Sequence, residues 1–134
     1  MALILLADDD ELVGEVVREA LSARGHVVGI VGNGIDAVKV VEMKRPALVI
    51  LDCAMPEMNG IEALRQIRLL PNAHRTPVLM LTGRRSEMDV EIAVRAGAND
   101  YLKKPFDADQ LIAHVEHLLD KARAGSATVG SMSA

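Results

Sequence analysis

The chain has 134 residues, a length typical of one domain with a continuous core. Its formal net charge is −4 and its aromatic residues are Tyr101 and Phe106. Nucleic-acid binding favours a basic face and stacking aromatics, so we expect no nucleic-acid partner. The single cysteine, Cys53, excludes an internal disulfide, and no apolar run approaches the ~20 residues that span a bilayer. We therefore expect a cytoplasmic protein without a membrane segment.

Apolar segments of strand length recur along the chain. They cover residues 2–7, 26–31, 47–52, 77–82 and, more weakly, 99–104. Most are apolar throughout, which is typical of strands that are buried on both faces of a sheet. The segments between them carry apolar residues at helical spacing, and the last such segment runs from Asp107 to about Lys121.

Capping and breaking residues indicate where the helices begin and end. A polar residue followed three positions later by an acid or an amide predicts a helix start, and this pattern occurs at Asn33, Ser86 and Asp107. Helix stops are predicted at Gly25, Pro46, Pro71 and Gly97. Both kinds of signal lie between the apolar segments, so strands and helices are expected to alternate.

Five strands that alternate with five helices predict an α/β fold with a doubly wound, five-stranded parallel sheet covered by helices on both faces. We assign residues 1–123 to this domain. Residues 124–134 are mostly small and polar without periodicity, and they predict a flexible C-terminal tail. In such sheets ligands bind at the carboxyl ends of the strands, near the point where the strand order reverses.

Polar residues stand at these strand ends. Asp8 and Asp9 end the first strand, Asp52 the third, Thr82 the fourth and Lys104 the fifth. If the strand ends converge, three carboxylates and one ammonium leave two negative charges, which one divalent cation neutralises. Mg²⁺ prefers such oxygen ligands, so the pattern predicts a Mg²⁺ site. A simpler interpretation, in which the acids are solvated residues at a helix start, stays open at this point.

A cation, a lysine and a hydroxyl around one carboxylate indicate phosphoryl transfer. Asp52 would attack phosphorus to form an aspartyl phosphate, while the cation and Lys104 neutralise the charge on the phosphoryl oxygens. Thr82 would then hydrogen-bond a phosphoryl oxygen. Asp10, by contrast, is interpreted as a helix-start acid that favours the helix dipole.

Four segments resemble the receiver domain of two-component response regulators. They are ILLADDDE, LVILDCAMPEMNG, LMLTG and GANDYLKKPF, and the resemblance extends over residues 2 to about 121 in the family's order and spacing. It implies a flavodoxin-like (βα)5 fold. It also implies that Asp52 is the phosphoacceptor, and that Asp8, Asp9, Asp52 and the backbone carbonyl of Ala54 hold Mg²⁺.

The resemblance assigns the remaining site residues as well. Thr82 and Tyr101 are implied to form a switch pair that reports phosphorylation. Lys104 is implied to pair with the phosphate, and the Lys104–Pro105 peptide is expected to be cis, which would aim Lys104 into the site.

The chain departs from the family pattern at a few positions. Asn59 stands where Asp is more common, at a turn position that Asn also tolerates. Gly83 replaces the commoner Ala beside the predicted switch threonine. Ala54 and Arg84 occupy positions that vary in the family and tune the phosphate lifetime.

The function implied is a phosphorylation-dependent signalling switch. A sensor histidine kinase or a histidine phosphotransfer protein supplies the phosphoryl group, and the module catalyses only its own phosphorylation and dephosphorylation. A downstream protein is expected on the face formed by the fourth helix, the strand at 99–104 and the last helix. A dimer that forms on phosphorylation is left open as a further partner.

Three alternatives are weighed against this function. The chain could be a receiver excised from a hybrid kinase or from a longer response regulator. It could be a degenerate receiver that acts by interaction alone, although no essential residue is missing. It could be a phosphatase or mutase with an aspartyl-phosphate intermediate, but such enzymes place a general acid where this chain has Ala54.

Other features have simpler interpretations. His114 and His117 lie one helical turn apart, a spacing that could bind a metal, but without a nearby acid or cysteine a solvated or partner-facing pair is favoured. Arg84 and Arg85 could steer an anionic donor or belong to a solvated loop. Cys53 is interpreted as a small buried hydrophobe rather than a redox group.

Overall fold

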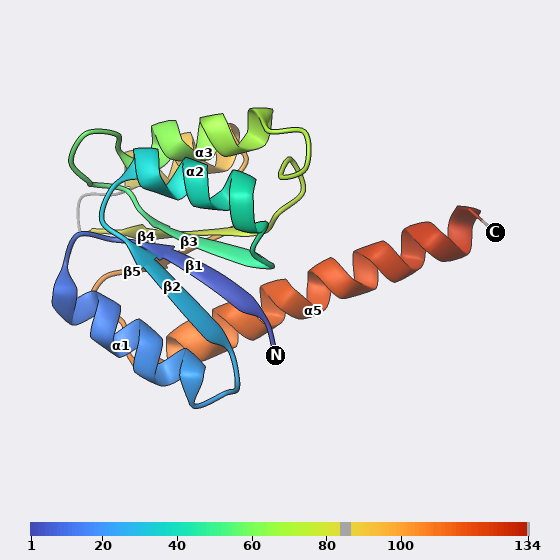
Figure 1. The fold of residues 1–134 in the computed structure, drawn as a ribbon, viewed down its shortest axis with the longest axis horizontal. Helices are drawn as coiled ribbons and strands as arrows, with labels where there is room; N and C mark the ends of the chain where they lie inside the picture. Colours follow the sequence, from blue (N-terminus) through green and yellow to red (C-terminus); the bar gives the residue numbers. More distant parts are fainter. Residues whose placement is uncertain (84–86, 134) are drawn as a thin grey trace.

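Five parallel strands form one sheet in the computed structural model, which describes residues 1–83 and 87–133 (Figure 1). The strands are β1 (Leu3–Ala7), β2 (Val27–Val31), β3 (Leu48–Asp52), β4 (Val78–Thr82) and β5 (Asp100–Lys103). The helices are α1 (Glu11–Ser22), α2 (Gly34–Lys44), α3 (Gly60–Leu69), α4 (Glu87–Ala96) and α5 (Ala108–Ser133). The strand order β2-β1-β3-β4-β5 reverses between β1 and β3, which confirms the predicted doubly wound α/β fold.

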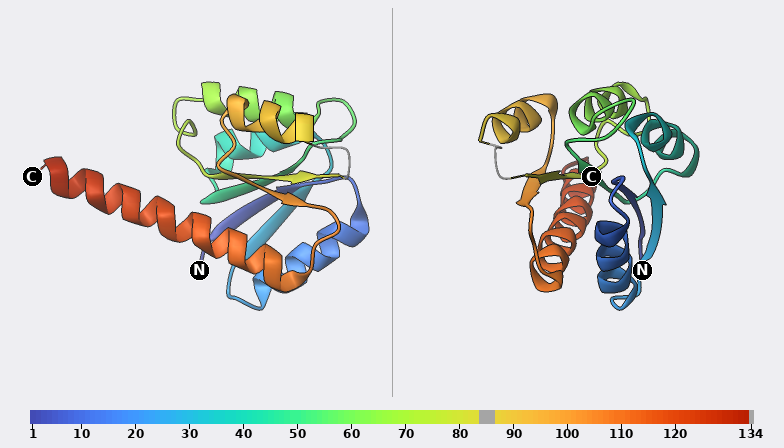
Figure 2. Two further views of the ribbon diagram at one scale, coloured as in Figure 1. Left: turned by 180° about the vertical axis from the view of Figure 1, so that it is seen from behind. Right: turned by 90° about the vertical axis from the view of Figure 1, so that its left-hand side faces the viewer.

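The helices cover both faces of the sheet, with α1 and α5 on one face and α2, α3 and α4 on the other (Figures 1 and 2). Side chains along β1 alternate between the two layers. Ile4 and Leu6 belong to the core under α1 and α5, whereas Leu5 and Ala7 belong to the core under the other three helices. Both sets are buried, which explains why β1 is a continuously apolar segment in the sequence.

Polar caps define the helix starts. The side chain of Asp10 accepts hydrogen bonds from the N–H groups of Leu12 and Val13, so Asp10 is the N-cap of α1. Asn33 caps α2 as predicted, and Asn59 caps α3. Asp107 and Gln110 form a reciprocal capping box at the predicted start of α5. The predicted start at Ser86 lies outside the described residues.

The predicted stop signals lie just beyond the helices. Gly25 follows α1 with a φ of 85° and Gly97 follows α4 with a φ of 105°, a left-handed backbone that glycine adopts without strain. Pro46 and Pro71 follow the ends of α2 and α3 within two residues.

Helix α5 is longer than the sequence pattern predicted. It continues past Lys121 to Ser133 and projects beyond the sheet (Figures 1 and 2). The segment after Lys121 contains no proline, so backbone hydrogen bonding can continue although its two glycines disfavour a helix by about 1 kcal/mol each. The division into a domain of residues 1–123 and a flexible segment of residues 124–134 stays a prediction.

Among the described residues, no helix combines the length and the apolar character that crossing a bilayer requires.

The start of α3 packs tightly against the end of β3. The N–H of Gly60 donates to the carbonyl of Cys53 at 3.1 Å, and a Cβ at position 60 would overlap the backbone carbonyl of Asp52. Gly60→Ala is therefore expected to lower the free energy of unfolding by about 1–3 kcal/mol, measured by urea denaturation. Gly83→Ala is the matched control, because a Cβ there meets no atom within 4 Å. Equal stabilities of the two variants would contradict this packing.

Candidate functional site

Three carboxylates converge at the carboxyl edge of the sheet. Asp8 follows β1 and Asp52 ends β3, the two strands between which the strand order reverses. One carboxylate oxygen each from Asp8, Asp9 and Asp52 lies within 4.8 Å of the other two. Asp8 and Asp52 are buried, whereas Asp9 is exposed. The edge therefore presents a compact, oxygen-only set of ligands with one side open to solvent.

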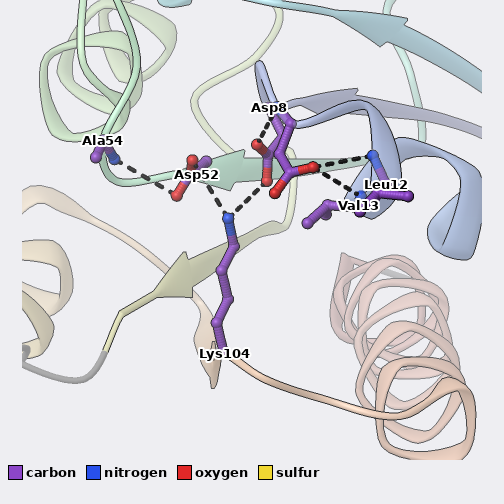
Figure 3. Close-up of polar contacts among 7 residues, drawn as sticks. Asp8, Leu12, Val13, Asp52, Ala54 and Lys104 are labelled. Atoms are coloured by element: carbon purple, nitrogen blue, oxygen red, sulfur yellow. Dashed lines mark hydrogen bonds and ion pairs between the residues drawn. The ribbon is translucent and has the colours of Figure 1, made fainter.

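Lys104 reaches this cluster from the end of β5 (Figure 3). Its Nζ lies 2.8 Å from Oδ2 of Asp8 and 3.4 Å from Oδ2 of Asp52. Its backbone N–H donates to the carbonyl of Thr82 at 2.7 Å, and the peptide bond to Pro105 is cis, as expected. One ammonium thus contacts two of the three carboxylates and leaves two negative charges uncompensated.

Backbone hydrogen bonds hold Asp8 in place. Its N–H donates to the carbonyl of Val31 at 3.0 Å, and its Oδ1 accepts from the N–H of Asp10 at 2.9 Å. The side chain of Asp10 instead caps α1. The run of three aspartates therefore divides into two members of the cluster and one helix cap.

Burial raises the pKa of Asp52 to about 6, and the neighbouring Asp8 carboxylate adds to the rise. The charge of Lys104 and the N–H of Ala54, which lies 3.5 Å from Oδ1 of Asp52, oppose it. Burial lowers the pKa of Lys104, but its hydrogen bond to Asp8 and the charges of both acids outweigh burial, so its pKa is raised. A cation that approaches Asp52 would therefore stabilise its ionised form relative to its protonated form.

Asp52→Asn is expected to raise the free energy of unfolding by about 1–2 kcal/mol at about pH 8 in the presence of a chelator. A carboxyl whose pKa rises on folding disfavours the folded state as the pH increases through the interval from 3.8 to about 6. The asparagine variant lacks this titration, and solvent at the open edge limits the effect. Urea denaturation at about pH 4 should show a much smaller difference; a difference independent of pH would contradict the assignment.

The other predicted site residues lie on β4, on β5 and just beyond β3, or outside the part of the chain that the structure describes. Thr82 ends β4 and is fully buried, and its Oγ1 has no hydrogen-bond partner within the described part of the chain. A buried hydroxyl without a partner is rare and costly. Tyr101 lies on β5 with 39% of its surface exposed, and Ala54 is exposed beyond β3. Arg84 and its neighbour Arg85 lie outside the described residues.

An apolar groove of about 410 Å³ adjoins Lys104. The groove is lined by Leu12, Val13 and Val16 of α1 and by Pro105 and Phe106 of the loop after β5. Gly83, which follows β4, completes the lining. Leu12 and Val16 are exposed. No groove was predicted here from the sequence, and the apolar residues at helical spacing on α1 were the available signal.

One sequence interpretation is wrong. The sequence predicts no acid beside His114, but its Nδ1 lies 2.6 Å from Oδ2 of Asp100. The two residues lie on β5 and α5, and only the packing of that helix beside that strand brings them together. Cys53 is partly buried and packs against the core under α2, α3 and α4.

An open parallel sheet with a carboxylate cluster and a lysine at its carboxyl edge defines a class of flavodoxin-like α/β domains. Residues 4–116 match the family model of the response regulator receiver domain. The chain therefore belongs to the response regulator receiver family, the receiver domains of two-component signalling.

Curated relatives support this assignment. Response regulator MprA of Mycobacterium leprae is 38% identical over 120 residues, which make up 90% of this chain and 52% of that protein. Response regulator MprA of Mycobacterium ulcerans is 37% identical over 120 residues, which make up 51% of that protein. The chain thus spans about half the length of the curated relatives that it matches.

Solved structures include receiver domains of kinases. The receiver domain of sensor histidine kinase PA1611 from Pseudomonas aeruginosa, which has a magnesium ion coordinated in its active-site cleft, superimposes with a TM-score of 0.83 at 34% identity, covering 89% of this chain and 98% of that one. The signal receiver domain of a histidine kinase from Syntrophus aciditrophicus gives a TM-score of 0.83 at 32% identity, covering 90% and 92%.

Proposed function

We propose that this chain is a phosphorylation-dependent switch of a two-component system and that Asp52 accepts the phosphoryl group. The observation that carries the proposal is the convergence of Asp8, Asp9 and Asp52 with Lys104, whose Nζ contacts two of the three carboxylates. An ionised carboxylate held beside a lysine and a cation site is the arrangement that in-line phosphoryl transfer requires.

The residues present fit a magnesium ion. Their donors are all oxygens, and the two uncompensated negative charges match one divalent cation. Asp8, Asp9, Asp52 and the backbone carbonyl of Ala54 are the ligands we propose. When bound, Mg²⁺ neutralises charge on the transferring phosphoryl oxygens.

The chain's own groups account for the transfer. A carboxylate oxygen of Asp52 attacks phosphorus, and the new O–P bond forms as the P–N bond to the donor's histidine breaks. The electron pair leaves with the imidazole, which takes a proton. Lys104 donates from Nζ to a phosphoryl oxygen, and the unpartnered Oγ1 of Thr82 is the group that can donate to a second oxygen. Water later hydrolyses the aspartyl phosphate, which restores the Asp52 carboxylate and releases inorganic phosphate. The reactions proposed for the module are thus its own phosphorylation and dephosphorylation.

The donor we propose is a sensor histidine kinase or a histidine phosphotransfer protein. The apolar groove beside Lys104, with Leu12 and Val16 exposed on its α1 side, suits the apolar face of a protein helix better than a small molecule. Such a donor also implies a cytoplasmic location. A receiver excised from a hybrid kinase stays an alternative, because two of the similar structures are receiver domains of kinases.

The output we propose is a shift between two pre-existing conformations, read by a downstream protein on α4, β5 and α5. Thr82 and Tyr101 are the proposed switch pair, since Thr82 is buried at the end of β4 and Tyr101 reaches the surface on the adjacent β5. A second copy of this chain, in a dimer that forms on phosphorylation through the same face, is the other partner we propose.

Intact-mass spectrometry after incubation with acetyl phosphate tests this function. We expect a gain of one phosphoryl group, about 80 Da, that requires Mg²⁺ and is lost in Asp52→Asn. Asp120→Asn, which changes a well-exposed carboxylate on α5, is the matched control and should be modified like the wild type. No adduct on the wild type under any condition would instead indicate a degenerate receiver that acts by interaction alone.

A further inference from the structure

A small pocket between β5 and α5 carries two imidazoles and a carboxylate. Its volume is about 220 Å³, and its lining residues are Asp100, Ala113, His114 and His117. Asp100 begins β5 whereas Lys104 follows its end, so at ~3.3 Å per strand residue the pocket lies roughly 13 Å from the lysine of the carboxylate cluster. The pocket is therefore separate from the proposed phosphorylation site.

The carboxylate of Asp100 fixes the protonation pattern of His114. Its Oδ1 accepts from the N–H of Tyr101 at 2.8 Å, and its Oδ2 lies 2.6 Å from Nδ1 of His114. Because a carboxylate accepts hydrogen bonds, Nδ1 carries the proton, and Nε2 of the neutral ring is left with a lone pair. A histidine that donates one ring N–H to a carboxylate and offers its other nitrogen is the arrangement that orients metal-binding imidazoles.

His117 supplies a second nitrogen donor. It lies one helical turn after His114, on the same face of α5, and lines the same pocket. None of the lining residues is cationic, so the local charge with both rings neutral is that of the Asp100 carboxylate. Imidazole nitrogens select zinc, copper and nickel, whereas Mg²⁺ prefers oxygen.

We propose that His114 and His117 form a binding site for a transition-metal dication of the zinc class, with Asp100 as the residue that positions His114. Two protein ligands leave coordination positions for water or for a side chain of another protein. A bound cation would attach to α5 beside the strand that carries Tyr101. The site does not rest on the proposed phosphorylation of Asp52.

Cu²⁺ titration followed by electron paramagnetic resonance tests the proposal, because imidazole nitrogens give hyperfine couplings that carboxylate oxygens do not. Excess Mg²⁺ is present throughout to occupy the carboxylate cluster. In the wild type we expect coupling to two nitrogens, and in His114→Gln and His117→Gln coupling to one. Zn²⁺ affinity, measured by competition with a chromophoric chelator, should fall at least tenfold in each variant.

His74→Gln is the matched control, since His74 is exposed on a loop outside the pocket and should leave both readouts unchanged. Asp100→Asn should keep both nitrogen couplings and weaken Zn²⁺ binding by about tenfold, because only the orienting acceptor is altered. Circular dichroism checks that each variant is folded. The proposal is overturned if the wild type binds Cu²⁺ through oxygen alone, or if the His114→Gln/His117→Gln double variant keeps the wild-type spectrum.

Discussion

Lys104→Met is expected to lower the free energy of unfolding by about 2 kcal/mol at about pH 8 without metal, because it leaves Asp8 and Asp52 buried and without their cation. Breaking a fully buried pair costs about 3–5 kcal/mol, and the 25% exposure of the lysine side chain reduces that value. The pKa of Lys104 is raised on folding. The charged lysine therefore contributes its full stabilisation of the folded state below its ordinary pKa of 10.5, and this stabilisation is lost only as the pH rises beyond that value.

Urea denaturation with a chelator measures this effect, and Lys103→Met is the matched control, because Lys103 is exposed beside the cluster lysine. Added Mg²⁺ should restore part of the stability of Lys104→Met, since a cation at the carboxylates replaces the missing charge. Equal unfolding midpoints for the two methionine variants in the presence of chelator would show that Lys104 does not stabilise the cluster.

Arg68→Ala is expected to destabilise the fold by about 3 kcal/mol. The guanidinium on α3 donates two hydrogen bonds to the carbonyl of Gly97, one each to the carbonyls of Ala73 and Thr76, and one to Oδ1 of Asn99, at 2.7–3.1 Å. These bonds join α3 to the loop before β4 and to the loop before β5. Alanine would leave partly buried acceptors unsatisfied, at about 1–3 kcal/mol each where water cannot replace the donor.

The matched control is Arg65→Ala on the same helix, whose 3.8 Å ion pair with Glu62 is solvent-exposed. We expect a change within about 0.5 kcal/mol there. Arg68→Lys should recover little stability, because an ammonium cannot reproduce the planar fork of donors. A loss in Arg68→Ala no larger than that in Arg65→Ala, measured by urea denaturation, would contradict the assignment.

The sheet was predictable because most of its strands are apolar throughout, although β5 contains only one buried residue, Leu102. Ile4 and Leu5 pack into opposite layers, so β1 reads as a single apolar segment and not as an alternating one. Asn33 and Asp107 capped their helices as their sequence patterns indicated. The length of α5 was not predictable, because small polar residues without periodicity do not distinguish a helix from an irregular segment.

The carboxylate cluster was predictable for a topological reason. Parallel strands place their carboxyl ends at one edge, so Asp8, Asp52 and Lys104 were expected to approach one another once the strands were assigned. Contacts that depend on helix packing were not predictable in this way. The pairing of Asp100 with His114 joins a strand to a helix and has no signature in the sequence.

The central claim is that Asp52 accepts the phosphoryl group, and the most direct measurement is to locate the modified residue. The protein is treated with acetyl phosphate and Mg²⁺, reduced with borohydride, which converts an aspartyl phosphate to homoserine, and mapped by peptide mass spectrometry. We predict homoserine at position 52 and unmodified aspartate at positions 8 and 9. Homoserine at either of those positions, or at no position, would contradict the claim.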